Sequence, residues 1–175
     1  DDTERIKRIV VHPDNPDIAL VAALGHEWGA NAMRGVFKTV DGGKTWDKVL
    51  YLDEDTGCSE LVMENDNPRV LYAGMWTFRR TPWRFDGGSG NTGLYRSMDG
   101  GENWEKIHNG LPEGPMTRIG IDIAQSEPNI VYLITEIPNG GTLFRSDDRG
   151  NNWRTVNKDP NINFRPLYYS DIRVD

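Results

Sequence analysis

The sequence has a single cysteine, Cys58, and no long hydrophobic run. One cysteine cannot form an internal disulfide, so cysteine usage does not indicate a cellular compartment. No apolar stretch approaches the roughly 20 residues of a membrane-crossing helix, so we expect no membrane span. The three histidines, at positions 12, 26 and 108, fall on separate predicted loops without the spacing of metal ligands. We therefore expect neither a metal ion nor a cofactor.

The sequence also contains fewer basic residues than acidic ones. Lys and Arg total 20 against 27 Asp and Glu, which gives a formal net charge of −7 at pH 7. A nucleic-acid groove needs clustered basic residues, so we expect no nucleic-acid partner. The chain opens at Asp1 without an initiator methionine or a signal peptide, as we expect of an excised or processed piece of a longer protein.

What the sequence does contain is an internal repeat, which begins at residues 39, 97 and 146. The three segments read TVDGGKTW, SMDGGENW and SDDRGNNW, and they share the pattern S/T-x-D-x-G-x-T/N-W. Five fixed positions in three segments are very unlikely to arise by chance. The chain is therefore built from repeated structural units.

Each unit also contains a predicted hairpin around a proline, at Pro16, Pro68 and Pro128. Apolar residues alternate on both sides of each proline, which predicts two paired strands, A and B. A short alternating strand C precedes each repeat segment, and a strand D follows it. Four strands around two tight turns are typical of a propeller blade. Residues 53–64 could alternatively form a short helix, but their register with the other units favours a strand.

We therefore predict an all-β fold, specifically a fragment of a β-propeller with three four-stranded blades and the first strand of a fourth. The predicted bounds are about 5–50, 58–108 and 116–157 for the blades and 169–175 for the fourth blade's first strand. Propellers close with about 4–8 blades, and closure protects the sheet edges. We expect the partners of this incomplete domain to be the remaining blades of the parent chain or a second copy.

The repeat segments themselves are predicted to be scaffold. The glycines would supply positive φ, the carboxylates would accept hydrogen bonds from turn N–H groups, and the tryptophans would pack between blades. The residues with this structural role are Thr39, Asp41, Gly43, Trp46, Ser97, Asp99, Gly101, Trp104, Ser146, Asp148, Gly150 and Trp153.

At these segments the sequence resembles the Asp-box, or BNR, repeat family, which includes sialidases, xyloglucan-active glycoside hydrolases and the sortilin/Vps10 ectodomain. Residues 26–29 (HEWG), 75–83 (MWTFRRTPW) and 110–114 (GLPEG) are similar to large bacterial exported proteins labelled BNR-repeat glycosyl hydrolases or sortilin-N-terminal-like proteins. The resemblance covers nearly the whole chain and implies a secreted or periplasmic location. The hydrolase label in that family is largely inherited from the fold, and a fold does not establish a function.

The two rims of the predicted disc differ. The A–B and C–D turns are uniform, whereas the B–C and D–A loops on the opposite rim vary between units, and function usually lies in variable loops on a rigid scaffold. Aromatic faces beside carboxylates and Arg side chains suit a sugar or an acidic or peptide ligand. The candidate ligand-binding residues are Glu27, Trp28, Arg34, Trp76, Arg79, Arg80, Trp83, Asp86, Glu113, Arg165 and Tyr168.

Two hypotheses follow. In the first, the chain is part of a glycosyl-hydrolase-like propeller that recognises, or even hydrolyses, carbohydrate through two facing carboxylates. The sequence identifies no catalytic pair, and its segment 164–167 (FRPL) only echoes the Phe-Arg-Ile-Pro segment of sialidases. In the second, a sortilin-like, non-catalytic propeller binds a peptide or a partner protein through aromatic and Arg anchors. If an enzyme at all, the protein would be an O-glycosyl hydrolase, and we expect the fragment alone to be inactive.

Overall fold

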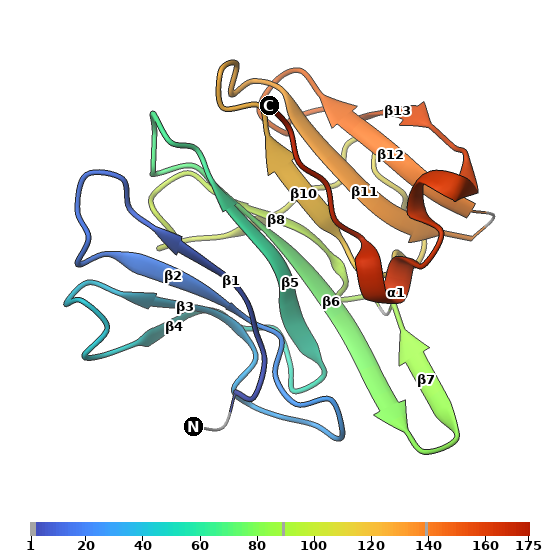
Figure 1. Ribbon diagram of the computed structural model, residues 1–175, viewed down its shortest axis with the longest axis horizontal. Coiled ribbons are helices and arrows are strands. Elements are labelled where there is room, and N and C mark those ends of the chain that lie inside the picture. Colours follow the sequence, from blue (N-terminus) through green and yellow to red (C-terminus); the bar gives the residue numbers. More distant parts are fainter. Residues whose placement is uncertain (1–2, 89, 139) are drawn as a thin grey trace.

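The computed structural model describes residues 3–88, 90–138 and 140–175, and in that part of the chain the strands form three antiparallel sheets (Figure 1). The first sheet, blade 1, contains β1 (Ile6–Val11), β2 (Ala19–Ala23), β3 (Gly35–Thr39) and β4 (Asp47–Leu50) in that order. The second, blade 2, contains β5 (Thr56–Met63), β6 (Leu71–Thr81), β8 (Gly93–Ser97) and β9 (Glu105–Lys106). The third, blade 3, contains β10 (Gly120–Ile123), β11 (Val131–Ile137), β12 (Gly140–Ser146) and β13 (Arg154–Asn157).

This architecture confirms the predicted all-β propeller fold with its four-stranded blades, and it shows that the alternative helix over residues 53–64 is wrong. One strand was not predicted. β6 runs well past the end of the blade and pairs with β7 (Arg84–Gly87) in an added hairpin. A 3₁₀ helix (Pro160–Asn163) and the single-turn helix α1 (Pro166–Tyr169) follow blade 3.

The strand register makes positions in different blades equivalent. One strand-A residue in each blade pairs with a corresponding strand-B residue: Ile9 with Val21, Leu61 with Ala73, and Ile121 with Leu133. Because side chains alternate across a sheet, these residues point to the same face of their respective blades. Each blade therefore has one face directed to the preceding blade and one directed to the following blade.

Two apolar cores lie between successive blades. The core between blades 1 and 2 joins Leu20 and Val36 to Leu61 and Met75, with Trp104 packed against it. The core between blades 2 and 3 is larger, and it joins side chains of both blades: Val62, Tyr72, Leu94, Ile121, Leu133, Phe144 and Trp153. Burial of apolar surface between the blades therefore holds the sheets together.

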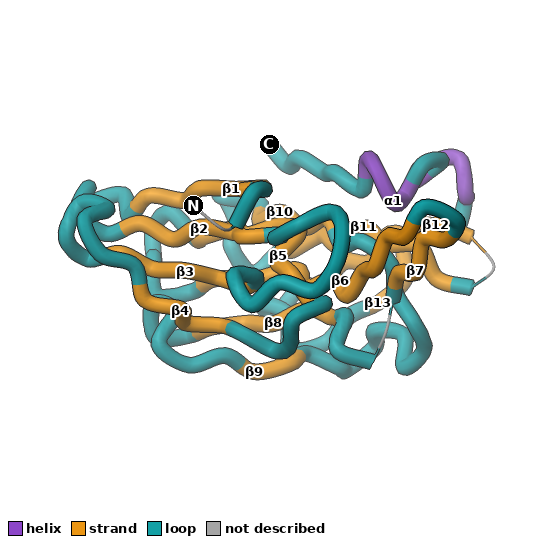
Figure 2. Tube along the Cα trace, turned by 90° about the horizontal axis from the view of Figure 1, so that it is seen from below, coloured by secondary structure: helices purple, strands orange, loops and turns teal. Residues whose placement is uncertain are grey.

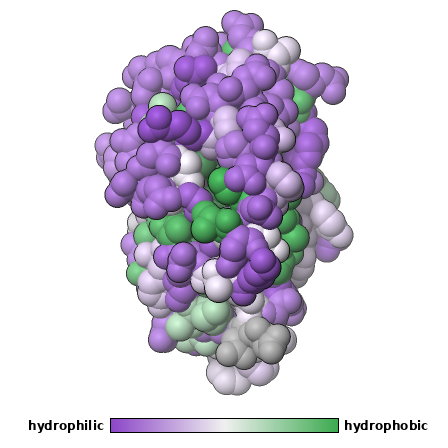
Figure 3. Space-filling view, turned by 90° about the vertical axis from the view of Figure 1, so that its left-hand side faces the viewer, coloured by the Kyte–Doolittle hydropathy of each residue, from purple (hydrophilic) through white to green (hydrophobic). Residues whose placement is uncertain are grey.

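Blade 1 has no blade on its other face. Ile9 is 61% exposed, although its equivalents Leu61 and Ile121 are fully buried, and Trp46 is 42% exposed where Trp153 is 6% exposed. A hollow of about 310 Å³ lies here, lined by Thr3, Ile6, Ile9, Val21, Met33, Phe37 and Trp46. Figure 3 views the molecule from the left-hand side of Figure 1, where the turns of blade 1 lie, and shows hydrophobic residues within a largely hydrophilic surface. Trp104 and Trp153 thus pack between blades, whereas the packing predicted for Trp46 stays a prediction, since no blade lies on that face here.

The end of the chain also differs from the prediction. Tyr169 closes α1, and residues 170–175 form no strand. They nevertheless follow β10, as Figures 1 and 2 show: the Val174 N–H donates to Asp122 Oδ2 at 2.9 Å, and the Ser170 carbonyl lies against Gly120. In each blade, strand A pairs with the strand B that follows it in the chain. The described residues contain no strand B after residues 170–175. A fourth blade beginning at 169–175 stays a prediction.

The turns between strands C and D, which we call the box turns (residues 39–46, 97–104 and 146–153), are closed by the carboxylate of each repeat. Asp99 Oδ1 accepts the Ser97 hydroxyl at 2.8 Å and the N–H of Glu102 and Asn103 at 3.0 and 2.9 Å. Asp41 and Asp148 accept equivalent bonds. In each turn the indole N–H donates to a glycine carbonyl at 3.1 Å. These carboxylates are fully engaged within their turns, as a structural role requires.

These hydrogen bonds make stability depend on pH. They lower the pKa of Asp41 and Asp99 from 3.8 to about 2, the largest contributions coming from the backbone N–H groups of Thr45 and Asn103. A carboxyl group whose pKa is depressed by folding stabilises the fold above its unfolded pKa, and this contribution is lost as the pH falls toward 2. We expect the melting temperature to decrease between about pH 4 and pH 2. The decrease should be smaller in Asp99→Asn, which cannot titrate at this turn, and a melting series by circular dichroism tests this.

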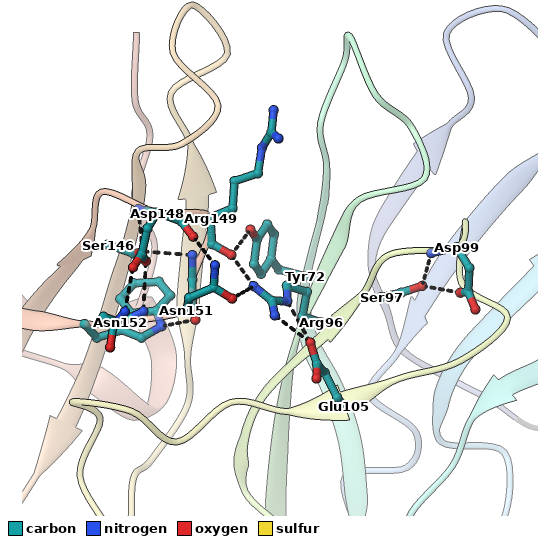
Figure 4. Close-up of polar contacts among 12 residues, drawn as sticks. Tyr72, Arg96, Ser97, Asp99, Glu105, Ser146, Asp148, Arg149, Asn151 and Asn152 are labelled. Atoms are coloured by element: carbon teal, nitrogen blue, oxygen red, sulfur yellow. Dashed lines mark hydrogen bonds and ion pairs between the residues drawn. The ribbon is translucent and has the colours of Figure 1, made fainter.

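The third box turn also fastens blade 3 to blade 2 (Figure 4). The Arg149 carbonyl accepts from the Tyr72 hydroxyl at 2.9 Å and from Arg96 Nη1 at 2.5 Å, while its guanidinium pairs with buried Glu64 at 3.1 Å. Arg149 has a φ of +55°, at the position where the other box turns have Gly42 and Gly100. A left-handed backbone conformation is unfavourable for a residue other than glycine. The contacts with blade 2 must therefore hold Arg149 in this conformation.

Candidate functional site

The two rims of the disc carry different kinds of connection. The A–B turns and the box turns lie on one rim, and the B–C and D–A connections lie on the other, which we call the loop rim (Figure 1). The β6–β7 hairpin extends from the loop rim. Each strand A begins at the loop rim, directly after the preceding connection. The first residues of strand A therefore lie beside the loops that vary between blades.

A small recess of about 100 Å³ opens on the loop rim where the three blades meet. We call it the cationic recess. Its lining consists of Arg5, Lys7, Leu24, Glu27, Trp76, Phe78, Arg80, Phe85, Arg118 and Tyr168. Of the residues predicted to bind a ligand, it brings together Glu27, Trp76, Arg80 and Tyr168. The lining contains four cationic side chains and one carboxylate, in a chain whose net charge is −7.

The one carboxylate is already bound on both sides. Glu27 Oε1 accepts from Arg80 Nη1 at 2.6 Å, and Glu27 Oε2 accepts from Arg5. Arg80 also stacks over Trp28, with 5.3 Å between the guanidinium carbon and the ring centroid. Trp28 is 53% exposed, so its indole flanks the recess with surface free for contact. The arrangement fixes Glu27 as a bridge between blade 1 and the β6–β7 hairpin.

Two further cations, Lys7 and Arg118, form no ion pair among the described residues, although the charge of Glu60 acts on both of them. Partial burial lowers the pKa of Lys7, and the charges of Arg118 and Arg5 lower it further. Burial likewise lowers the pKa of Arg118, whose Nη1 donates to the backbone carbonyl of Tyr168. Glu60 opposes both shifts and Asp171 opposes that of Arg118, so the chain itself counters part of the positive charge. A bound anion would lower the remaining electrostatic cost.

The wall of the recess is aromatic. Trp76 stacks on Phe78 with 4.7 Å between centroids, and Phe85 packs on both rings at 5.9 and 6.3 Å. Trp76 is only 3% exposed, yet its indole N–H has no acceptor among the described residues. A buried donor without a partner is uncommon and is costly in a folded protein.

The prediction that Arg34 contacts a ligand is wrong. It is fully buried, donating to the carbonyls of Leu24 and His26 at 2.9 Å and of Gly29 at 3.2 Å. Its guanidinium carbon also lies 4.5 Å from the centroid of the Phe78 ring. A side chain without exposed surface cannot contact a ligand, so Arg34 orders the B–C loop of blade 1.

The other candidates lie outside the recess lining. Arg79 pairs with Asp55, and Asp86 pairs with Arg84. Trp83 is 83% exposed at the end of the β6–β7 hairpin. Glu113 lines a separate hollow of about 260 Å³ between the B–C loop of blade 2 and the connection that leads from blade 2 to blade 3. Arg165 stacks over Tyr168 at 5.5 Å. That these residues bind a ligand stays a prediction.

Sequence reasoning missed Arg5, Lys7 and Arg118. It searched the long B–C and D–A loops, whereas these residues lie at or just before the first strand of a blade. Strand A is the innermost strand, so residues at its loop-rim end converge on the centre of the disc. A search for charged residues at that position in each repeat would have found them.

Several acidic residues of the loop rim are already bound by neighbouring side chains. Glu27, Asp55, Asp86 and Asp171 are each paired with arginine, and Asp53 accepts from Asn91. In the described part of the chain, no group of three or more His, Cys, Asp or Glu residues is arranged to hold a metal ion. Nor does any described helix have the length and apolarity needed to cross a membrane.

Comparison with solved structures identifies the fold as that of a β-propeller. An ancestral GH74 enzyme matches 90% of this chain with a TM-score of 0.66 and 18% identity, and the GH74 xyloglucanase from Xanthomonas campestris matches 88% with a TM-score of 0.63 and 14% identity. YCF48 bound to D1 peptide matches 91% with a TM-score of 0.55 and 19% identity.

Each of these structures is larger than the chain described. The chain spans 19% and 22% of the two GH74 chains and 41% of the YCF48 chain. In sequence, no family model and no curated protein matches it. The comparisons therefore establish the fold, with this chain covering part of a larger propeller in each case.

Proposed function

We propose that this chain is a section of an exported Asp-box propeller that binds carbohydrate through its loop rim without hydrolysing it. The observation that carries the proposal is the cationic recess, an aromatic and basic site whose one carboxylate is already bound by two arginines. Sugar-binding surfaces combine flat aromatic faces with a few polar groups that fix the orientation of the ligand.

The absence of hydrolysis follows from the state of the carboxylates. Glycoside hydrolysis needs two of them, about 5–5.5 Å apart for retention or about 6.5–9.5 Å apart for inversion, with one protonated as an acid. Glu27 is held between Arg5 and Arg80, with both of its oxygens already accepting hydrogen bonds. The recess lining has no second carboxylate.

Two further observations support the proposal that the chain is part of an exported, carbohydrate-binding propeller. The hydrogen-bonded box turns fit the Asp-box repeat family, whose bacterial members resembling this sequence are exported. The similarity in fold to a xyloglucanase is consistent with a polysaccharide ligand, since closely similar scaffolds can present different loops. We also propose that the open face of blade 1 is covered in the intact protein by a further blade or by a second copy.

A binding experiment tests the function. The natural full-length protein is applied to an array of plant and bacterial polysaccharides and, separately, to an array of peptides, and sugar release is assayed on every polysaccharide that binds. We expect retention on a polysaccharide without new reducing ends. Binding to peptides alone would contradict carbohydrate recognition and would favour a sortilin-like function. Release of reducing ends would contradict a purely binding role, whether or not it persists in Glu27→Gln.

A matched pair of variants locates the binding surface. Trp28→Ala removes an exposed indole beside the recess, and Met98→Ala removes an exposed side chain from a box turn on the opposite rim. We expect binding to weaken about tenfold in Trp28→Ala, because an aromatic contact of about 1–1.5 kcal/mol is lost. It should be unchanged in Met98→Ala. Equal affinities for both variants would place the ligand elsewhere.

A further inference from the structure

We propose that the cationic recess is a carboxylate subsite, so that the ligand is an acidic polysaccharide carrying uronate groups. This inference rests on the proposed function and specifies the class of carbohydrate. It is drawn from the charge, the unpaired donor and the size of the recess.

The charge of the recess calls for an anion. Arg5 and Arg80 share Glu27, which leaves Lys7 and Arg118 beside one another without a carboxylate of the recess bound to either. Like charges brought together at a partly buried surface are unfavourable unless a counter-charge joins them. Two ammonium or guanidinium groups that flank one opening can bind the two oxygens of a single carboxylate by charge-assisted hydrogen bonds.

The recess also has donors without acceptors. The Trp76 indole N–H is buried and unpaired, and so is Arg118 Nε, among the described residues. Both side chains line the recess. Both nitrogens are enclosed, so a ligand oxygen reaches them only if these side chains shift toward the opening, whereas an apolar ligand leaves them unsatisfied at a cost. The unpaired donors therefore indicate a ligand rich in acceptor oxygens.

The recess is small, with a volume of about 100 Å³, which is enough for a carboxylate and its hydrating waters. With the carboxylate bound in the recess, the ring of a uronate would lie outside, where Trp28 and Tyr168 are both more than half exposed on the rim. Flat aromatic surfaces next to a carboxylate subsite suit a pyranose better than a flexible acidic side chain, which needs no such surface.

The probes of the experiment are an oligogalacturonate, the same oligosaccharide with its carboxylates reduced to alcohols, and a poly-glutamate peptide of similar charge. Binding to the natural full-length protein is measured by calorimetry at low and at physiological salt. We expect the oligogalacturonate to bind at least tenfold more tightly than the reduced oligosaccharide and more tightly than poly-glutamate. The difference should shrink at higher salt.

Variants assign the effect to the recess. Lys7→Gln and Arg118→Gln should each weaken oligogalacturonate binding about tenfold and leave binding of the reduced oligosaccharide unchanged. Arg118→Lys, which keeps the charge, should restore part of the affinity. Lys44→Gln removes the same charge from an exposed position on the box-turn rim and serves as the matched control. Melting curves check that each variant is folded.

The outcomes separate the two proposals. Equal binding of both oligosaccharides, with Lys7→Gln silent, would overturn the carboxylate subsite and leave carbohydrate binding standing. Tight binding of poly-glutamate alone, lost in Lys7→Gln, would overturn the polysaccharide as ligand. Failure to bind any polysaccharide on the array would overturn the proposed function itself.

Discussion

Ile121→Ala is expected to lower the free energy of unfolding of this chain by about 3 kcal/mol, within the 2–5 kcal/mol typical of a large aliphatic side chain removed from a core. Ile121 is fully buried between blades 2 and 3, where it packs in the core with Leu133 and Phe144. The loss combines the transfer of the removed methyl and methylene groups with the cavity they leave. Urea unfolding followed by tryptophan fluorescence measures it.

The matched control is Ile9→Ala. Ile9 has the same register position in blade 1 but is 61% exposed, so its removal should change the free energy of unfolding by less than about 0.5 kcal/mol. The same chemical change is thus made twice, once with a neighbouring blade and once without. Equal losses would show that contacts between blades do not stabilise the chain.

The second large effect is expected at the centre of the disc. Arg8→Ala should lower the free energy of unfolding by about 3–5 kcal/mol, because it leaves a buried carboxylate uncompensated. The side chain of Glu60 is only 5% exposed, and Arg8 binds both of its oxygens, with Nε at 2.6 Å and Nη2 at 3.0 Å. This pair joins the innermost strands of blades 1 and 2.

Two controls distinguish this interpretation from a loss of packing. Arg154→Ala breaks an exposed pair with Asp147 at 3.3 Å and should cost no more than about 1 kcal/mol. The double variant Arg8→Met with Glu60→Leu removes both charges and should recover most of the lost stability. If the double variant is as unstable as Arg8→Ala, the buried charge is not the cause.

The arrangement of the fold could be predicted from the sequence because it repeats. Alternating apolar residues on both sides of Pro16, Pro68 and Pro128, together with the box turns, specify four strands per blade, and the structure has them. The role of Asp41, Asp99 and Asp148 also followed from turn chemistry alone, because an Asp preceding a Gly-containing turn has only nearby N–H groups to bind.

What could not be predicted depends on features that occur once. The β6–β7 hairpin lies in a single long loop, with no second copy in the sequence to reveal its pattern. The burial of Arg34 could not be predicted, because arginine is usually exposed and only the folded loop supplies the three carbonyls that bind it in the interior. The recess joins residues from all three blades, so its members are far apart in sequence, and no local pattern links Lys7 to Arg118.

The two rims differ in how far their polar side chains are already bound within the chain. On one rim, the carboxylates of the box turns are occupied by turn N–H groups, which makes these recurrent residues structural. On the loop rim, Lys7 and Trp76 retain charge and hydrogen-bonding capacity that the chain itself does not use. The recurrent residues of the box turns therefore belong to the scaffold, and we propose that binding takes place on the rim where the repeats differ.

The equivalence of blade positions is the claim on which both the disc and its two rims depend, and Ile9 tests it most directly. In the natural full-length protein, a neighbouring blade on the open face would bury Ile9 as Leu61 and Ile121 are buried here. Ile9→Ala should then cost about 3 kcal/mol in that protein, as Ile121→Ala does in this chain. A cost below about 0.5 kcal/mol in the full-length protein would contradict the account, because that face would have no blade on it.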